Sequence, residues 1–117
     1  MKVDYRKIYG ESELLDTFLN KSAGEVIREI RQSQNLSLNQ VEKKTEMFTK
    51  QTLSKYELGK SKIRMNVFFE LAKIYNIEPK ELYEKINMRY LSKLSQYTDA
   101  IMKGGVKNES RNKKTKR

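Results

Sequence analysis

The chain has 117 residues and a formal net charge of +10. This length suits one small domain with tails, and the positive charge favours a polyanionic partner such as nucleic acid or an anionic membrane. The sequence contains neither cysteine nor histidine. Their absence excludes disulfides, the usual zinc sites and the commonest general base at neutral pH. We therefore expect no cofactor, no bound metal and no enzymatic activity.

The positive charge is concentrated near the C-terminus. Residues 103–117 carry seven basic side chains against Glu109, a balance of +6 that leaves +4 for residues 1–102. Because residues 104–117 are charged and lack a hydrophobic period, we expect a disordered basic tail. Such a tail either keeps the chain soluble or adds sequence-independent affinity for a nucleic-acid backbone.

No apolar run approaches the roughly 18 residues that are needed to span a bilayer. Residues 1–20 also lack the hydrophobic centre of a signal peptide. We therefore expect a cytoplasmic protein with no membrane partner.

Apolar stripes at helical spacing predict an all-α fold. Residues 1–21 form a predicted N-terminal extension with a helix over Glu11–Asn20, whose stripe includes Leu15 and Phe18. This stripe either covers the core or makes a dimer contact, because periodicity does not distinguish one buried surface from another.

Residues 22–87 are predicted to form a compact bundle of five helices. The helices are expected over Gly24–Gln34, Leu38 to about Thr45, Thr49–Leu58, Met65 to Tyr75, and from Pro79 through Ile86. Leu82, Tyr83 and Ile86 are expected to face inward from the fifth. Either Met47 or Phe48 should fill the core below the connection between the second and third helices.

The third helix has a clear start, a clear end and two distinct faces. Thr49 is a good N-cap, and Gly59 can adopt the left-handed conformation that ends a helix. Leu53 and Tyr56 are three residues apart and face inward. The outward face then consists of polar side chains that can address base edges and phosphates: Lys50, Gln51, Ser54 and Lys55.

Residues 88–103 predict a further C-terminal helix that ends at Gly104-Gly105. Its apolar side chains follow a three-four spacing: Tyr90, Leu91, Leu94, Tyr97 and Ile101. The stripe either packs against the domain or the N-terminal helix, or forms a homodimer interface. The dimer candidates are Leu91, Leu94, Tyr97, Ile101, Leu15 and Phe18.

Residues 23–86 resemble the helix-turn-helix family of lambdoid phage repressors and xenobiotic-response-element regulators. The residues that carry the resemblance are 25–31, Leu36-Ser37, Val41, 52–57, Gly59-Lys60 and 71–77. The sequence pattern of residues 54–63 and 68–71 looks most like that of the N-terminal domains of Rgg/MutR-type regulators. The resemblance implies a lambda-repressor-like DNA-binding bundle with an extra helix at each end.

The resemblance also implies roles for individual residues. Arg31 and Glu57 correspond to a buried structural ion pair of the family. Lys50 and Gln51 stand where the family contacts bases, and Ser54 lies one turn further on. The expected phosphate contacts are Lys55, Lys60, Lys62 and Arg64, with Lys43 and Lys44 as weaker candidates that are otherwise ordinary surface lysines.

The sequence departs from the family pattern around the turn before the third helix. The family commonly has Gln, a small residue and Gly where this chain has Leu38, Glu42 and Glu46, and the turn is one residue longer. The carboxylates of Glu42 and Glu46 would lie near the DNA. The sequence therefore does not define the angle at which the third helix docks.

Two functions follow from these patterns. The first is a sequence-specific double-stranded DNA-binding transcriptional regulator, expected to be a homodimer. The alternative is a protein-interaction module, such as an antitoxin or an adaptor, that uses the same fold to hold a protein partner. From its length of 117 residues, we expect the chain to lack the helical-repeat domain with which full-length Rgg-type proteins sense peptides.

Overall fold

The computed structural model describes the backbone of residues 12–107 and the side chains of residues 15–103. Five helices make up this part of the chain: α2 (Ser12–Ser33), α3 (Leu38–Glu42), α4 (Lys50–Glu57), α5 (Met65–Ile74) and α6 (Pro79–Lys107). No strand occurs among residues 12–107. The predicted all-α fold class is confirmed. Residues 1–11 and 108–117, which belong to the predicted extension and tail, lie outside the described residues.

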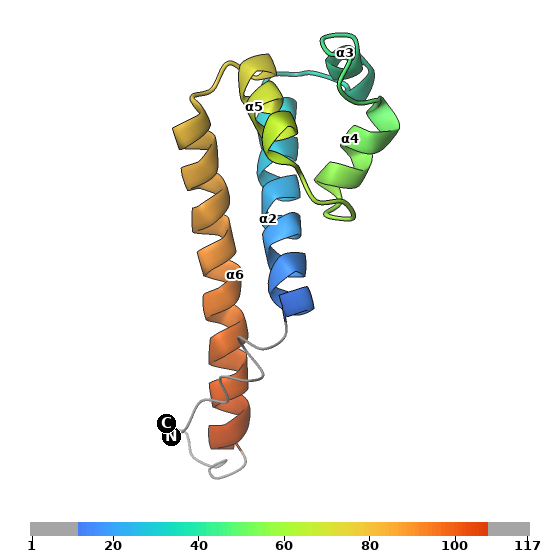
Figure 1. Cartoon of the computed structure of the whole chain (residues 1–117). Coiled ribbons are helices and arrows are strands. Elements are labelled where there is room, and N and C mark those ends of the chain that lie inside the picture. Colours follow the sequence, from blue (N-terminus) through green and yellow to red (C-terminus); the bar gives the residue numbers. More distant parts are fainter. Residues whose placement is uncertain (1–11, 108–117) are drawn as a thin grey trace.

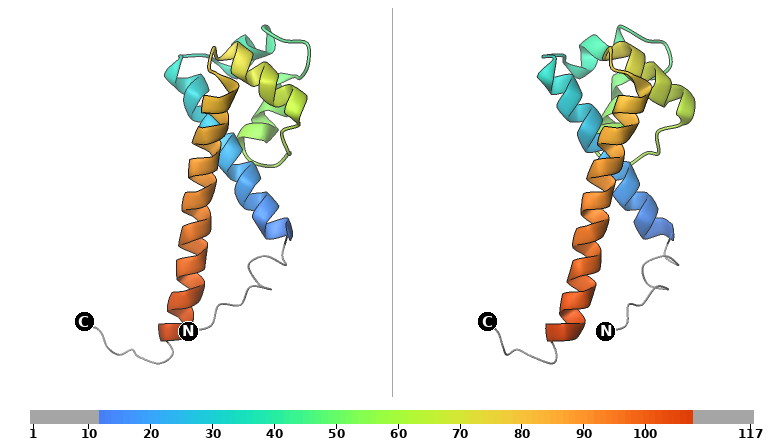
Figure 2. Two further views of the ribbon diagram at one scale, coloured as in Figure 1. Left: turned by 60° about the vertical axis from the view of Figure 1, so that its left-hand side comes forward. Right: turned by 90° about the vertical axis from the view of Figure 1, so that its left-hand side faces the viewer.

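Two long helices, α2 and α6, form the axis of the molecule (Figure 1). They pack against each other in opposite directions and cross, as Figure 2 shows. The shorter helices α3, α4 and α5 gather at one end of this pair, with α4 packed on α2. The C-terminal part of α6 projects beyond the described start of α2.

The sequence prediction of separate terminal helices was wrong at both junctions. Helix α2 runs through the predicted boundary at Ala23-Gly24, and α6 runs through Asn87 and past Gly104-Gly105 to Lys107. Neither junction contains a proline, and an interior glycine costs only about 1 kcal/mol relative to alanine. Packing between α2 and α6 is sufficient to keep both helices continuous.

Helix α3 is shorter than predicted, because it ends at Glu42 and not near Thr45. At its start, the Ser37 hydroxyl accepts a hydrogen bond from the Gln40 amide, and the Gln40 side chain accepts one from the Ser37 amide. This reciprocal capping box satisfies two amides that the helix itself leaves unpaired. Helix α3 is therefore a single well-capped turn followed by an irregular connection, residues 43–49.

In this connection, Phe48 is the residue that fills the core. It is buried and packs edge-on against Tyr56, with ring centroids 6.1 Å apart, whereas Met47 is 49% exposed. The prediction that Tyr83 faces inward was wrong, because Tyr83 is 59% exposed while Leu82 and Ile86 are buried. The remaining core is continuous across the helices: Val26, Ile27, Val41, Leu53, Val67, Leu71, Ala72 and Tyr75.

Three helices end in the same way, with a residue in the left-handed conformation. These residues are Asn35 (φ 58°), Gly59 (φ 74°) and Asn76 (φ 53°). After α4, the amide of Lys60 donates to the carbonyl of Lys55, and the amide of Gly59 donates to that of Tyr56. This Schellman arrangement satisfies carbonyls at the helix end and turns the chain sharply toward α5.

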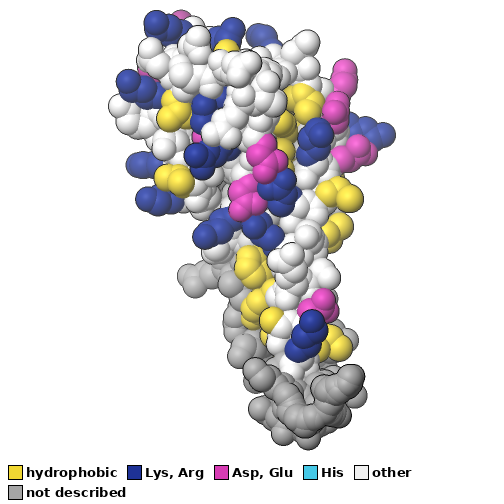
Figure 3. All heavy atoms as spheres, turned by 180° about the vertical axis from the view of Figure 1, so that it is seen from behind, with side chains coloured by type: hydrophobic (Ala, Val, Ile, Leu, Met, Phe, Trp, Pro, Cys, Tyr) yellow, Lys and Arg dark blue, Asp and Glu magenta, His cyan; other side chains and the backbone are white. Residues whose placement is uncertain are grey.

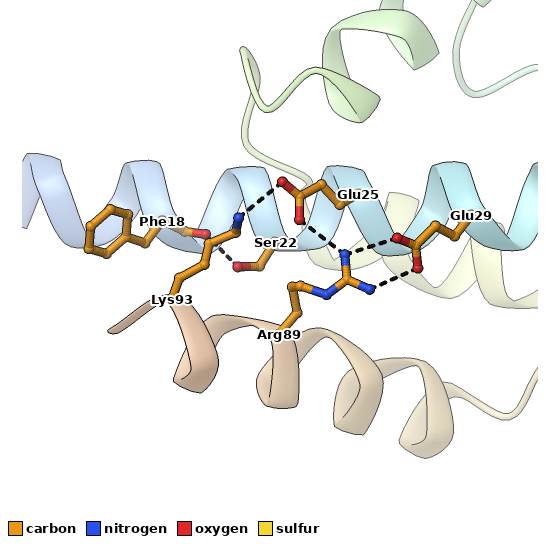
Figure 4. Close-up of polar contacts among 6 residues, drawn as sticks. All are labelled: Phe18, Ser22, Glu25, Glu29, Arg89 and Lys93. Atoms are coloured by element: carbon orange, nitrogen blue, oxygen red, sulfur yellow. Dashed lines mark hydrogen bonds and ion pairs between the residues drawn. The ribbon is translucent and has the colours of Figure 1, made fainter. Parts of the chain in front are cut away.

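A network of charged side chains joins α2 to α6 (Figure 4). The Arg89 guanidinium donates hydrogen bonds to Glu25 and Glu29 at 2.8–3.0 Å, and Lys93 Nζ donates to Glu25 at 3.0 Å. Partial burial opposes ionisation of Glu25, but the bonds from Lys93 and Arg89 outweigh it and lower its pKa. The hydrogen bond from Arg89 lowers the pKa of Glu29, and the two carboxylates raise that of Arg89.

Candidate nucleic-acid interface

Two side chains hold the start of α4. The Thr49 hydroxyl accepts a hydrogen bond from the Thr52 amide at 3.2 Å, as expected of an N-cap. In addition, Oε2 of Glu42, the last residue of α3, accepts a hydrogen bond from the Lys50 amide at 3.0 Å. Sequence reasoning treated Glu42 only as a departure from the family pattern. Its contact spans eight residues and an irregular connection, so no local signal predicts it.

The end of α4 lies against α2 at a glycine. A Cβ atom on Gly24 would overlap the carbonyl oxygen of Tyr56 and would lie 2.6 Å from that of Glu57. At Gly59 a Cβ atom would also lie 2.9 Å from the Lys21 Cα. The two backbones therefore approach more closely than any other residue type would allow. This close packing fixes the position of α4 on the long helix.

The structure brings Arg31 and Glu57 together as a bidentate ion pair. Arg31 Nε lies 2.6 Å from Glu57 Oε2, Nη2 lies 3.0 Å from Oε1, and Nη1 donates to the Leu36 carbonyl at 2.7 Å. Both residues are at least nine-tenths buried. The hydrogen bond from Arg31 to Glu57 raises the pKa of the guanidinium. The pair ties α2 to the last residue of α4 and to the turn before α3.

The side chains that sequence analysis proposed for base contacts lie on the outer face of α4. Lys50 and Gln51 are exposed and Ser54 is half-buried, while Leu53 and Tyr56 point into the core. The proposed phosphate-contact side chains are also exposed: Lys43, Lys44, Lys55, Lys60, Lys62 and Arg64. Lys and Arg side chains gather on the edge of the molecule that carries α3 and α4, at the upper left in Figure 3.

Sequence reasoning missed Arg28 as part of this surface. Arg28 is exposed and, with Ser54 and Leu58, lines a concavity of about 150 Å³ whose wall includes the Arg31–Glu57 pair. Arg28 stands three residues before Arg31, and residues three apart share one side of a helix. That spacing is the signal that relates Arg28 to α4.

The six dimer candidates do not form one free stripe. The rings of Phe18 and Tyr97 pack edge-on, with centroids 5.3 Å apart, so part of the N-terminal stripe covers part of the C-terminal one. Leu15, Leu94 and Ile101 are half-buried, whereas Leu91 is 49% exposed.

Among the described residues, no group of three or more Asp or Glu side chains is arranged to hold a metal ion. None of the helices α2 to α6 combines the length and apolar character that crossing a membrane requires.

The comparison with protein families agrees with this geometry. Residues 27–82, which run from the middle of α2 through the start of α6, match the helix-turn-helix family model. No curated protein and no solved structure matches the chain. The helix-turn-helix domain is a DNA-binding regulatory domain. Residues 27–82 of this chain belong to the helix-turn-helix family of phage repressors and xenobiotic-response-element regulators.

Proposed function

We propose that the chain is a sequence-specific double-stranded DNA-binding transcriptional regulator that reads the major groove with α4. The observation that carries this proposal is a firmly anchored α4 with a free polar face. Gly24, the buried Arg31–Glu57 pair and the two N-terminal hydrogen bonds hold the helix. Lys50 and Gln51 remain exposed beside them. A recognition helix needs this combination, because direct readout requires fixed donor and acceptor positions.

The exposed side chains have chemistry that suits base readout. Gln51 can pair bidentately with adenine, Lys50 can donate to guanine O6 and N7, and Ser54 can reach a base or a phosphate. Each good bidentate contact contributes about 1–3 kcal/mol of discrimination against the wrong base. Gln51 and Lys50 occupy the first turn of α4, the part of a recognition helix that enters the groove first.

The cations around α4 supply affinity that does not depend on sequence. Lys60, Lys62 and Arg64 follow the Gly59 turn in a segment that leads from α4 to α5, and all three are exposed. We propose that this segment grips the DNA backbone, with support from Lys55 and from Lys43 and Lys44 beside α3. Each phosphate that is neutralised adds about 0.9 to the slope of log affinity against log salt.

We also propose that the protein acts as a homodimer. A two-fold pair would place two α4 helices about 34 Å apart on a pseudo-palindromic site. The projecting part of α6 and the half-exposed Leu91 support an interface on this helix. Leu91→Arg should then lower the mass seen by light scattering from dimer to monomer. An unchanged dimer mass would exclude Leu91 from the interface.

The decisive experiment selects bound sites from random double-stranded DNA and then compares two variants. Gln51→Ala should relax one base position, whereas Lys60→Ala should weaken every site and lower the salt slope by about one unit. Lys80→Ala is the matched control for lost charge, because Lys80 is exposed in the first turn of α6, a helix outside the proposed DNA interface. Equal affinity for random and selected DNA across salt would refute the proposal and favour an interaction module.

A further inference from the structure

We infer that Glu42 is a positioning residue that sets the angle at which α4 enters DNA, an inference that rests on the proposed function. Its carboxylate accepts the hydrogen bond from the Lys50 amide at 3.0 Å, and Glu42 is itself the last residue of α3. The bond therefore joins the end of one helix directly to the first residue of the next. Together with the direct packing of α3 on α4, this bond sets the relative orientation of the two helices of the helix-turn-helix.

The connection between these helices is long enough to need such a bond. Residues 43–49 form no regular helix, and their local hydrogen bonds bind the turn to itself: the Thr45 amide donates to the Glu42 carbonyl, and the Met47 amide donates to the Thr45 hydroxyl. An irregular connection constrains the helices that it joins only weakly. The Glu42 carboxylate and the buried Phe48 add to the direct packing of α3 on α4.

Electrostatics reinforces the positioning role. The N-terminus of a helix carries a partial positive charge that a carboxylate stabilises. The same carboxylate lies beside the proposed base reader Lys50, where it repels DNA phosphates. Glu42 thus orders α4, which increases the ratio of specific to non-specific binding, while its charge lowers the affinity for all DNA sequences alike.

Glu46 provides a matched control within the same connection. It is acidic and exposed, and its side chain makes no hydrogen bond or ion pair with another residue of the described part of the chain. Glu46→Ala therefore removes the same charge as Glu42→Ala without removing a helix cap. Glu42→Gln removes the charge but keeps an oxygen that can accept the Lys50 hydrogen bond.

The test measures the affinity of the chain for its selected DNA site and for the same site with a change at the base that Gln51 reads. Glu42→Ala should reduce the ratio of the two affinities about fivefold, the effect of losing an N-terminal cap. Glu46→Ala and Glu42→Gln should each leave this ratio within about twofold of the starting chain, while all three raise affinity for random DNA at low salt. An equal fall in the ratio for Glu42→Ala and Glu46→Ala, or for Glu42→Ala and Glu42→Gln, would overturn the inference.

Amide hydrogen exchange separates this inference from the proposed function, because it needs no DNA. In the free protein, the Lys50 amide should exchange faster in Glu42→Ala than in Glu46→Ala. Equal exchange would overturn the positioning role whatever DNA the protein binds. Faster exchange in a protein that selects no discrete site would refute the proposed function and leave the contact between α3 and α4 established.

Discussion

A Cβ atom on Gly24 would lie 2.6 Å from the carbonyl oxygen of Glu57, so α2 and α4 touch through their backbones. Gly24→Ala should therefore move α4 away from α2. Alanine favours a helix over glycine by about 1 kcal/mol, but the displaced contacts should outweigh that gain and leave a net loss of about 1–3 kcal/mol. Urea unfolding followed by circular dichroism measures the change. An unchanged or increased stability would contradict the close packing.

Removal of one partner of the Arg31–Glu57 pair should destabilise the fold more than replacement of both partners by apolar residues. Arg31→Met leaves the Glu57 carboxylate buried without its partner, which should cost about 3–5 kcal/mol. The double variant Arg31→Met/Glu57→Leu removes both charges and should recover part of that loss. Free energies of unfolding at pH 7 provide the comparison. If the double variant loses as much stability as Arg31→Met and Glu57→Leu lose together as single changes, the two residues are not coupled.

The hydroxyl of Tyr75 is buried within the core and has no hydrogen-bond partner in the described part of the chain. Burial, followed by the nearby Glu57 charge, raises the pKa of this phenol. Because a buried polar group without a partner is unfavourable, Tyr75→Phe should leave stability unchanged or increase it by about 1 kcal/mol. A decrease of that size in thermal or urea unfolding would mean that the hydroxyl makes a stabilising contact.

The network around Arg89 should make stability depend on pH. Glu25 and Glu29 have lowered pKa values in the folded chain, so their contribution is present above the unfolded value of about 4.3 and is lost as pH falls through the folded values. Arg89→Ala should destabilise the chain by only about 1 kcal/mol at pH 7, because the network is partly exposed.

Denaturation at pH 7 and near pH 3 tests this dependence. The difference between Arg89→Ala and the starting chain should shrink as the pH falls. Lys80→Ala, an exposed change on the same helix, is the control and should show little effect at either pH. A difference for Arg89→Ala that is equal at both pH values would exclude the two carboxylates as its cause.

Arg28 extends the proposed backbone contacts to α2. If DNA approaches the outer face of α4, the Arg28 guanidinium beside Ser54 should reach a phosphate. Arg28→Ala should then weaken binding to all sequences alike and lower the salt slope by about 0.9. Fluorescence anisotropy at several salt concentrations measures both effects. A slope that matches the Lys80→Ala control would place Arg28 outside the interface.

The sequence predicted the local features of α4 and its neighbours well. Thr49 caps α4, Gly59 ends it, and Leu53 and Tyr56 face the core. These features depend on residues a few positions apart, so local chemistry is sufficient to predict them. The proposed base and phosphate contacts are side chains that the fold leaves accessible, and their roles stay predictions.

Other features depend on contacts between distant parts of the chain. The sequence analysis divided the chain after residue 21, yet α2 is continuous from Ser12 to Ser33 and packs on α4 and α6. Periodicity alone did not reveal that Phe18 packs on Tyr97, because a stripe shows which face is buried and not what buries it.

The sequence by itself determined that the fold is all-α, where the short helices start, and that a polar face follows Thr49. Only the tertiary structure decided how firmly that face is held. The glycine contact at Gly24 and the Glu42 bond to Lys50 both join residues from separate helices. Such contacts arise from the way whole helices pack, and no local pattern of residues encodes their geometry.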